Sequence, residues 1–165
     1  MLIAGKLIKE KTGSWWCVEA DAIGAFTQGS SRKDAVAMLK DLVEAMLNDA
    51  SARVTVHDVG MSDDGTVSVI IECSDPGALA ARVLRYQREV HGLTLEQVSK
   101  TLGITSRNAF ARYEQNRATP TLGKYGKLLA AVAPEMSIMV GFRKPARAAK
   151  ASKTPRAEMK HRLAR

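Results

Sequence analysis

Cysteine, aromatic residues and long apolar runs are all scarce in this sequence. Its 165 residues include only two cysteines, Cys17 and Cys73, with no C-x-x-C spacing and no histidine close to either. A disulfide framework or a zinc site is therefore not expected, and both cysteines are interpreted as core-facing strand residues. No apolar run approaches the roughly 18 residues that cross a bilayer, and the N-terminus lacks the long apolar core of a signal peptide. These absences predict a cytoplasmic protein without a membrane span.

Charge is unevenly distributed along the chain, which has 25 Lys and Arg against 17 Asp and Glu. Residues 1–76 carry a net charge of −5, residues 77–142 of +5, and residues 143–165 of +8. The last segment has almost no apolar side chain to bury, so we expect residues 141–165 to be a basic, disordered tail. Such a tail is either a solubilising terminus or a non-specific contact for a polyanion, whose counterions Lys and Arg displace.

The first half of the chain has the pattern of strands around one helix. Alternating apolar residues predict five strand segments, at residues 2–9, 14–20, 25–28, 54–56 and 67–73. Asp63-Asp64-Gly65 is the turn signal between the last two. After the third segment, Ser30 or Ser31 is expected to cap a helix that packs on the sheet. Its apolar residues recur at a spacing of three and four: Ala35, Met38, Leu39, Leu42, Val43 and Met46.

A change of periodicity divides the chain. Ser74-Asp75-Pro76-Gly77 is a boundary and a helix start, and from Ala78 to Val132 the pattern is helical with short breaks. We therefore predict an α+β protein, with a small domain of antiparallel sheet plus helix over residues 1–74. An all-α domain over residues 75–140 and the tail over residues 141–165 follow it.

Part of the helical half has the pattern of a helix-turn-helix. Residues 95–102 and 106–115 predict two short helices, joined by the turn Gly103-Ile104-Thr105. The first should cross a DNA backbone, and the second should enter the major groove. Ser106 is expected to cap the second helix and to leave its first-turn side chains free to reach base edges.

The expected exposed stripe of this second helix has side chains that suit base reading. Arg107 and Asn108 lie in its first turn, and Arg112 follows Asn108 by four residues, whereas Phe110 and Tyr113 are expected to pack inward. Arginine pairs with guanine and asparagine with adenine, so the stripe predicts sequence-specific DNA binding.

Residues 85–129, RYQREVHGLTLEQVSKTLGITSRNAFARYEQNRATPTLGKYGKLL, resemble the Xre/Cro-type helix-turn-helix repressor domain. The resemblance implies that Arg107, Asn108 and Arg112 face bases and that Asn116 and Arg117 lie near phosphates. With the capping serine, the predicted set is Ser106, Arg107, Asn108, Arg112, Asn116 and Arg117. The resemblance also implies a buried structural pair, Arg88 with Glu114. Leu95 stands where many members have a phosphate-binding Gln, so contacts at that helix start are left to Thr94 or to the backbone.

Two acidic residues raise the possibility of enzymatic activity. Glu19 and Asp21 alternate along a predicted strand and could hold magnesium on one face. No further acidic position is fixed by the pattern, and neither a phosphate-binding glycine loop nor a nucleophile motif is present. Solvated strand residues are the preferred interpretation, so no catalytic residue, metal site or cofactor is predicted.

The predicted order strand, strand, short strand, helix, strand, together with the segment DAIGAFTQGSSRKDAVAMLKDLVEAML at residues 21–47, resembles the HicB antitoxin family over most of residues 1–73. The phrase SRNAFARYEQ at residues 106–115 is similar to the helix-turn-helix variant of that family. The family's usual proline-glycine-cysteine turn is replaced here by Ala22-Ile23-Gly24-Ala25. The resemblance implies a degenerate, catalytically incompetent ribonuclease H-like domain, followed by a DNA-binding domain.

The resemblance also implies the partners. They are a small, basic, HicA-like toxin that cleaves messenger RNA and an operator, expected to be palindromic, at which the chain represses its own operon. A homodimer or higher even oligomer is expected, because joining two weak DNA-binding domains raises affinity. The dimer surface could be a sheet edge or residues 128–139. A first domain of net charge −5 can attract a basic toxin and compete with RNA for it without any chemistry.

Two rival functions remain open at the level of sequence. One is a stand-alone helix-turn-helix transcriptional regulator without a cognate toxin. The other is a metal-dependent nuclease, whose activity would need Glu19 or Asp21.

Overall fold

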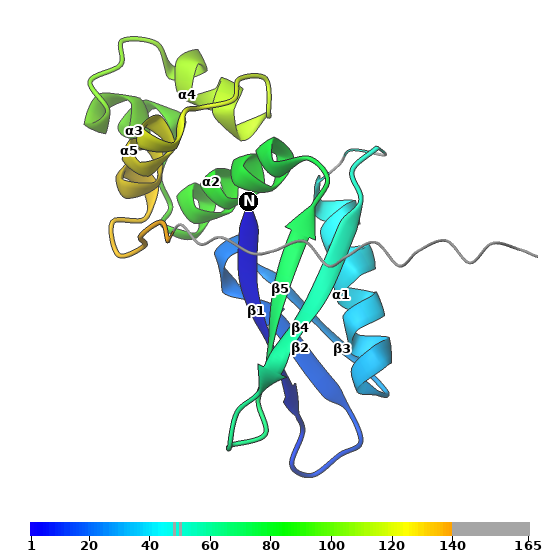
Figure 1. Ribbon diagram of the computed structural model, residues 1–165. Coiled ribbons are helices and arrows are strands. Elements are labelled where there is room, and N and C mark those ends of the chain that lie inside the picture. The colour runs from blue at the N-terminus through cyan, green and yellow to red at the C-terminus, as the bar shows by residue number, and fades with distance from the viewer. Residues whose placement is uncertain (48, 50, 140–165) are drawn as a thin grey trace, which may run out of the picture.

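The computed structural model describes residues 1–47, 49 and 51–139, and the expected tail lies outside them (Figure 1). Within this range the chain is α+β, as predicted, with a five-stranded antiparallel sheet and five α-helices. The strands are β1 (Leu2–Lys9), β2 (Trp16–Ala20), β3 (Ala25–Gly29), β4 (Val54–Met61) and β5 (Val67–Cys73). The helices are α1 (Arg32–Leu47), α2 (Pro76–Val90), α3 (Leu95–Thr101), α4 (Arg107–Glu114) and α5 (Leu122–Val132), with a 3-10 helix η1 (Asp21–Ile23) after β2. Figure 1 shows α1 alongside the sheet and α3, α4 and α5 gathered beyond one end of it, with α2 between.

The strands lie in the order β3-β2-β1-β5-β4, so β1 is central and β3 and β4 are the edges. Leu7 in β1 is opposite Val18 in β2 and Val67 in β5. The predicted turn joins β4 to β5. There the Asp64 carboxylate accepts a hydrogen bond from the Thr66 amide at 2.9 Å, and Gly65 takes a left-handed φ of 83°.

Strand alternation gives the sheet one buried face, which forms the core with α1. Leu7, Val18 and Ile71 are fully buried on this face. α1 covers it with three residues that lie four apart and are also fully buried: Ala35, Leu39 and Val43. A helix with a single apolar stripe against a sheet is the expected two-layer arrangement.

The two cysteines lie on different faces of the sheet. Cys73 is buried in the core, as expected, whereas Cys17 is only partly buried. Val18 and Ala20 occupy the inward positions of β2, so alternation turns Cys17 to the opposite face. The prediction of a core-facing side chain was therefore wrong for Cys17.

The start of α1 confirms Ser31 as its capping residue. The Ser31 hydroxyl accepts a hydrogen bond from the Asp34 amide at 3.1 Å, and the Asp34 carboxylate accepts one from the Ser30 amide at 2.8 Å. This reciprocal pattern satisfies amides that have no partner within the helix. Gly29, at the end of β3, packs so closely against the Ala35 backbone that a Cβ would not fit. The entry of the chain into α1 is thereby fixed.

The other face of the sheet is open in the described chain. It presents apolar side chains that include Leu2, Ile8 and Phe26, of which Phe26 is 63% exposed. An ion pair on this face joins Lys6 to Glu19 at 2.7 Å, and Glu19 raises the pKa of Lys6 by its hydrogen bond and its charge. Exposed apolar groups rimmed by charge are typical of a surface that binds another protein.

α2 starts as predicted, because the Asp75 carboxylate accepts a hydrogen bond from the Gly77 amide at 2.8 Å and Pro76 occupies the first turn. Further along α2, Arg82 donates two hydrogen bonds to the Ile23 carbonyl, at 2.9 and 3.2 Å, and Gln87 donates one to the Ala22 carbonyl at 3.1 Å. α2 therefore binds the segment between β2 and β3 as well as the helices that follow it.

The end of η1 fits closely against α2. Gly24 takes a left-handed φ of 66°, and a Cβ there would overlap the ring of Tyr86. The Tyr86 ring also lies under the Arg82 guanidinium, 5.4 Å from its centroid. Glycine is needed at position 24 both for its backbone conformation and for its lack of a side chain.

α5 is buried on the side that faces α2. The Tyr125 hydroxyl donates to the Ala80 carbonyl at 3.4 Å, and burial raises the pKa of its phenol. Leu128, Leu129 and Val132 are buried within the chain, whereas Ile138 and Met139 are exposed, so within residues 128–139 it is the part after α5 that offers apolar surface for a dimer contact. Among the described residues, none of the helices combines the length and the apolar character of a membrane span.

Candidate nucleic-acid interface

α3 and α4 are short helices joined by a tight turn, at the positions that the sequence predicts. Gly103 takes a left-handed φ of 65°, and the Ile104 amide donates back to the Ser99 carbonyl at 2.8 Å. This is the Schellman ending, which satisfies carbonyls that the helix leaves without partners. α3 begins with a reciprocal cap, in which Thr94 accepts from the Gln97 amide and the Gln97 side chain accepts from the Thr94 amide. Both ends of α3 are therefore fixed by local hydrogen bonds.

α4 has one buried and one exposed side. Phe110 is fully buried and Tyr113 packs partly buried against the same core, as predicted. Asn108 and Arg112 lie on the exposed side, and neither side chain has a hydrogen-bond or ion-pair partner among the residues that the structure describes. Arg107 is the first residue of α4. An exposed asparagine and arginine with unused donors, four residues apart, can reach the edges of bases together.

Ser106 occupies the N-cap position of α4 with an extended backbone, but its hydroxyl accepts no capping hydrogen bond in the described chain. Its carbonyl instead accepts from the Ala109 amide at 3.0 Å, which closes a tight first turn. The expected side-chain cap is therefore not formed. The amides of the first two residues of α4 therefore donate no hydrogen bond to this side chain, which leaves them able to donate to a phosphate oxygen.

Asn116 has a structural role at the end of α4. This residue has a left-handed φ of 54°, the only positive φ outside glycine among the described residues, and its amide donates to Tyr113 at 3.3 Å. The Arg117 amide donates to the Arg112 carbonyl at 2.8 Å, so α4 also ends in a Schellman motif, with asparagine in the position usually taken by glycine. The Asn116 side chain donates to the Asp75 carboxylate at 2.7 Å.

The structure thus gives different roles to the two residues expected near phosphates. Asn116 has internal partners at the start of α2, although its side chain is exposed. Arg117 is exposed, and in the part of the chain that the structure describes its guanidinium has no partner. Of the two, Arg117 is the one with donors available to a phosphate.

The pair of Arg88 and Glu114 is present, as the resemblance to repressor domains implies. Arg88 Nε lies 2.6 Å from Glu114 Oε1, and Arg88 Nη2 lies 3.2 Å from Oε2. The third arm of the guanidinium donates to the Leu93 carbonyl at 3.0 Å. Glu114 is only 6% exposed, so this carboxylate holds α4 against α2 and is not available as a catalytic group.

The acidic residues considered for magnesium do not form a metal site together. Glu19 is paired with Lys6, and Asp21 lies in η1, beyond the end of β2, so the two do not alternate along one strand as expected. Over the described ranges, no group of three or more His, Cys, Asp or Glu side chains could hold a metal ion.

Sequence reasoning missed Asp75 as a contact of the turn after α4, because the two lie 41 residues apart in the chain. It also missed Arg82 and Arg85 on α2, whose spacing of three places them near one face of a helix. That spacing was the only sign in the sequence that Arg82 and Arg85 could act together, because the segments that lie opposite α2 come from distant parts of the chain.

Comparison with known proteins adds no further constraint. No protein-family model matches the chain, and no curated protein matches its sequence.

Proposed function

We propose that this chain is a HicB-like antitoxin with two parts. In this proposal, residues 1–74 form a degenerate ribonuclease H-like domain that neutralises a small, basic, HicA-like toxin that cleaves messenger RNA. Residues 75–140 form a helix-turn-helix domain that binds operator DNA and represses the chain's own operon. Both partners are met in the cytoplasm, and neither role needs catalysis by this chain.

The observation that carries the DNA-binding part is the two-sided character of α4. Phe110 anchors the helix in the core, while Asn108 and Arg112 project from it with no partner in the described chain. Unpaired asparagine and arginine donors on a helix anchored in this way suit bidentate pairing with adenine and guanine. Arg117, on the turn that follows, can add a contact to the phosphate backbone of the DNA, and this contact does not depend on the base sequence.

The open face of the sheet supports the toxin-binding part. Ile8 and Phe26 are exposed on it, and the segment that contains it, residues 1–76, has a net charge of −5. Apolar side chains can contribute affinity, and the acidic charge favours association with a basic partner. In this arrangement the antitoxin blocks the RNA-binding surface of the toxin by occupying it.

A homodimer or a higher even oligomer completes the proposal, because one such DNA-binding domain binds weakly and two bind a palindrome cooperatively. Residues 128–132 of α5 are mostly buried in the chain itself. The edge strand β4, with exposed Val59 and Met61, and the segment after α5, with exposed Ile138 and Met139, are the two candidates for the dimer contact.

Co-expression with any short, basic open reading frame that lies adjacent to this gene tests the proposal. The full chain, tagged, should co-purify with that product and restore growth to cells that express it. A Phe26→Asp variant should lose rescue, whereas an Arg112→Ala variant should rescue growth but fail to repress a reporter placed behind the operon promoter.

The two rival functions, a stand-alone regulator and a nuclease, predict other results. Repression without a toxic neighbour or a complex would indicate a stand-alone transcriptional regulator. Magnesium-dependent cleavage of RNA by the purified chain, lost in Glu19→Gln, would indicate a nuclease and refute the antitoxin proposal.

A further inference from the structure

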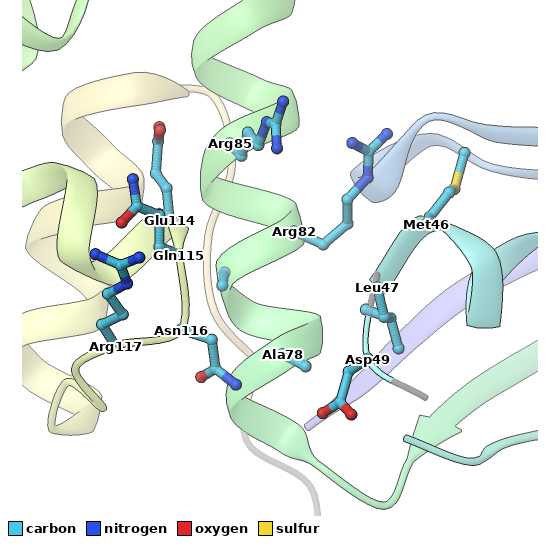
Figure 2. A pocket seen from close by; sticks show the side chains of 11 residues that line it. Met46, Leu47, Asp49, Ala78, Arg82, Arg85, Glu114, Gln115, Asn116 and Arg117 are labelled. Carbon is cyan, nitrogen blue, oxygen red and sulfur yellow. The ribbon is translucent and has the colours of Figure 1, made fainter. Parts of the chain in front are cut away.

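A groove lies alongside α2. Its volume is about 420 Å³, and Ala78 and Ala81 of α2 are among the residues that line it (Figure 2). One wall is the end of α1, at Met46 and Leu47, and the other is the turn of residues 115–117 after α4. Small-molecule sites are typically about 300–1,000 Å³, so the groove has room for a nucleotide-sized ligand.

Three arginines line this groove. Figure 2 shows Arg82 and Arg85 projecting from α2 and Arg117 from the turn after α4. Arg117 has no partner in the described chain, and Arg85 is bound only to Glu89, at 2.9 Å, in an exposed pair. Exposed pairs of this kind are weak, so Arg85 can exchange Glu89 for a ligand. Arg82 uses Nε and Nη2 to hold the Ile23 carbonyl, which leaves Nη1.

The two carboxylates that line the groove are already engaged. Glu114 receives two hydrogen bonds from Arg88, and the Asp49 carboxylate accepts from both the amide and the hydroxyl of Ser51, at 2.8 and 2.7 Å. Arg88 thus neutralises Glu114, whereas Asp49 keeps its negative charge, because the hydrogen bonds from Ser51 stabilise its ionised form and lower its pKa. The three arginines in the lining face this one uncompensated carboxylate, so the net charge of the groove is positive. Two guanidiniums with donors still available favour a ligand that carries negative charge.

The wall that bears Arg117 is held in place. Asn116 closes the Schellman motif and donates to Asp75 at 2.7 Å, and Gly77 leaves space for the Asn116 side chain against α2. A fixed turn presents Arg117 at low entropic cost, and preorganisation of this kind raises affinity.

We infer that this groove binds a phosphate group. Guanidinium forks match the oxygens of phosphate in geometry as well as in charge, which distinguishes arginine from lysine as a phosphate ligand. The phosphate comes either from a free phosphorylated molecule or from the backbone of nucleic acid bound at α4. The second source rests on the proposed DNA binding, whereas the first is independent of it.

The test uses the full chain and inorganic pyrophosphate as the probe, titrated by calorimetry at constant ionic strength. The variants are Arg85→Gln and Arg117→Gln, and the matched control is Lys40→Gln, which removes one positive charge from the exposed side of α1 away from the groove. Thermal unfolding of each variant establishes that it is folded. We expect pyrophosphate binding that both groove variants weaken at least tenfold and that the control leaves unchanged.

A second arm measures duplex DNA binding as a function of salt. A phosphate held by Arg85 contributes about 0.9 to the slope of log affinity against log salt concentration, so Arg85→Gln should lower that slope by about one. If the wild type binds pyrophosphate and the groove variants do not, the phosphate comes from a free ligand. If the wild type does not bind pyrophosphate but Arg85→Gln changes the slope, the phosphate comes from nucleic acid. If pyrophosphate does not bind and Arg85→Gln leaves the slope unchanged, the groove proposal is refuted and DNA binding stands. If no duplex binds, the operator proposal fails, and pyrophosphate alone decides the groove.

Discussion

Arg88 in α2 and Glu114 in α4 form a bidentate ion pair between helices whose residues lie 26 positions apart in the chain. The side chains are 16% and 6% exposed, so both charges are largely removed from water. Such a pair adds little net stability, because desolvation offsets the attraction, but it penalises any arrangement in which the two charges do not meet. It therefore fixes how the exposed side of α4 is presented.

Removal of one partner should be far more damaging than replacement of both. Glu114→Ala leaves the Arg88 guanidinium buried without its carboxylate and should lower the free energy of unfolding by about 3–5 kcal/mol. The double variant Arg88→Met, Glu114→Leu should recover much of that loss. Urea denaturation of the singles and the double measures the coupling. Additive effects of the two substitutions would show that the pair is not coupled.

Gly24 should be irreplaceable because of Tyr86. Gly24→Ala imposes a left-handed backbone on an alanine, which costs about 1–2 kcal/mol. Overlap with the Tyr86 ring adds about 1–3 kcal/mol of overpacking. Gly65→Ala is the matched control, since Gly65 also has a positive φ but has open space where a Cβ would lie. Thermal denaturation should show a larger decrease in the melting temperature for Gly24→Ala than for Gly65→Ala. Equal decreases in the melting temperature would contradict the packing argument.

The proposed DNA interface makes separate predictions for base and phosphate contacts. Arg107→Ala or Asn108→Ala should relax discrimination at one base pair by about 1–3 kcal/mol, whereas Arg117→Ala should weaken binding to all duplexes alike. Binding to operator and to random DNA, measured at several salt concentrations, distinguishes the two effects. Equal losses on both DNAs in every variant would refute the assignment.

Stability should fall in acid partly through Asp64. Hydrogen bonds from the Ser62 hydroxyl, at 2.6 Å, and from the Thr66 amide lower the pKa of this carboxylate below its ordinary value of 3.8. A lowered folded-state pKa contributes stability above about pH 3.8 that is lost as the pH falls through the folded-state pKa. The difference in unfolding free energy between pH 6 and pH 3 should therefore be smaller in Asp64→Asn than in the wild type.

Asp63→Asn is the control for that measurement, because it removes the same charge from the neighbouring residue. The interpretation fails if the two variants change the pH dependence by the same amount.

Local signals predicted much of the fold. Alternation located the strands, Ser31 and Asp75 located the starts of α1 and α2, and Gly103 located the turn between α3 and α4. These features depend on hydrogen bonds between residues a few positions apart, which the sequence displays directly. The sidedness of α4 was predictable for the same reason, since Phe110 and Asn108 differ in polarity at helical spacing.

Features that depend on distant segments were not predictable. Nothing near Asn116 in the sequence indicates that Asp75 will accept its side chain, and nothing near Arg85 indicates the opposite walls of the groove. Cys17 was misplaced because an apolar side chain fits either face of an alternating strand, and only its neighbours Val18 and Ala20 decide which face is buried. The Ser106 cap failed because its residue type permits a cap but does not enforce one.

The attachment of α2 to both halves has a consequence for dividing the protein. A fragment that ends at residue 74 would lack Arg82 and Gln87, and the carbonyls of Ile23 and Ala22 would lose their donors. A fragment that begins at residue 75 would expose the side of α2 that covers them. The halves are therefore not interchangeable modules, and an exchange between related chains would have to carry α2 together with both of its partner surfaces.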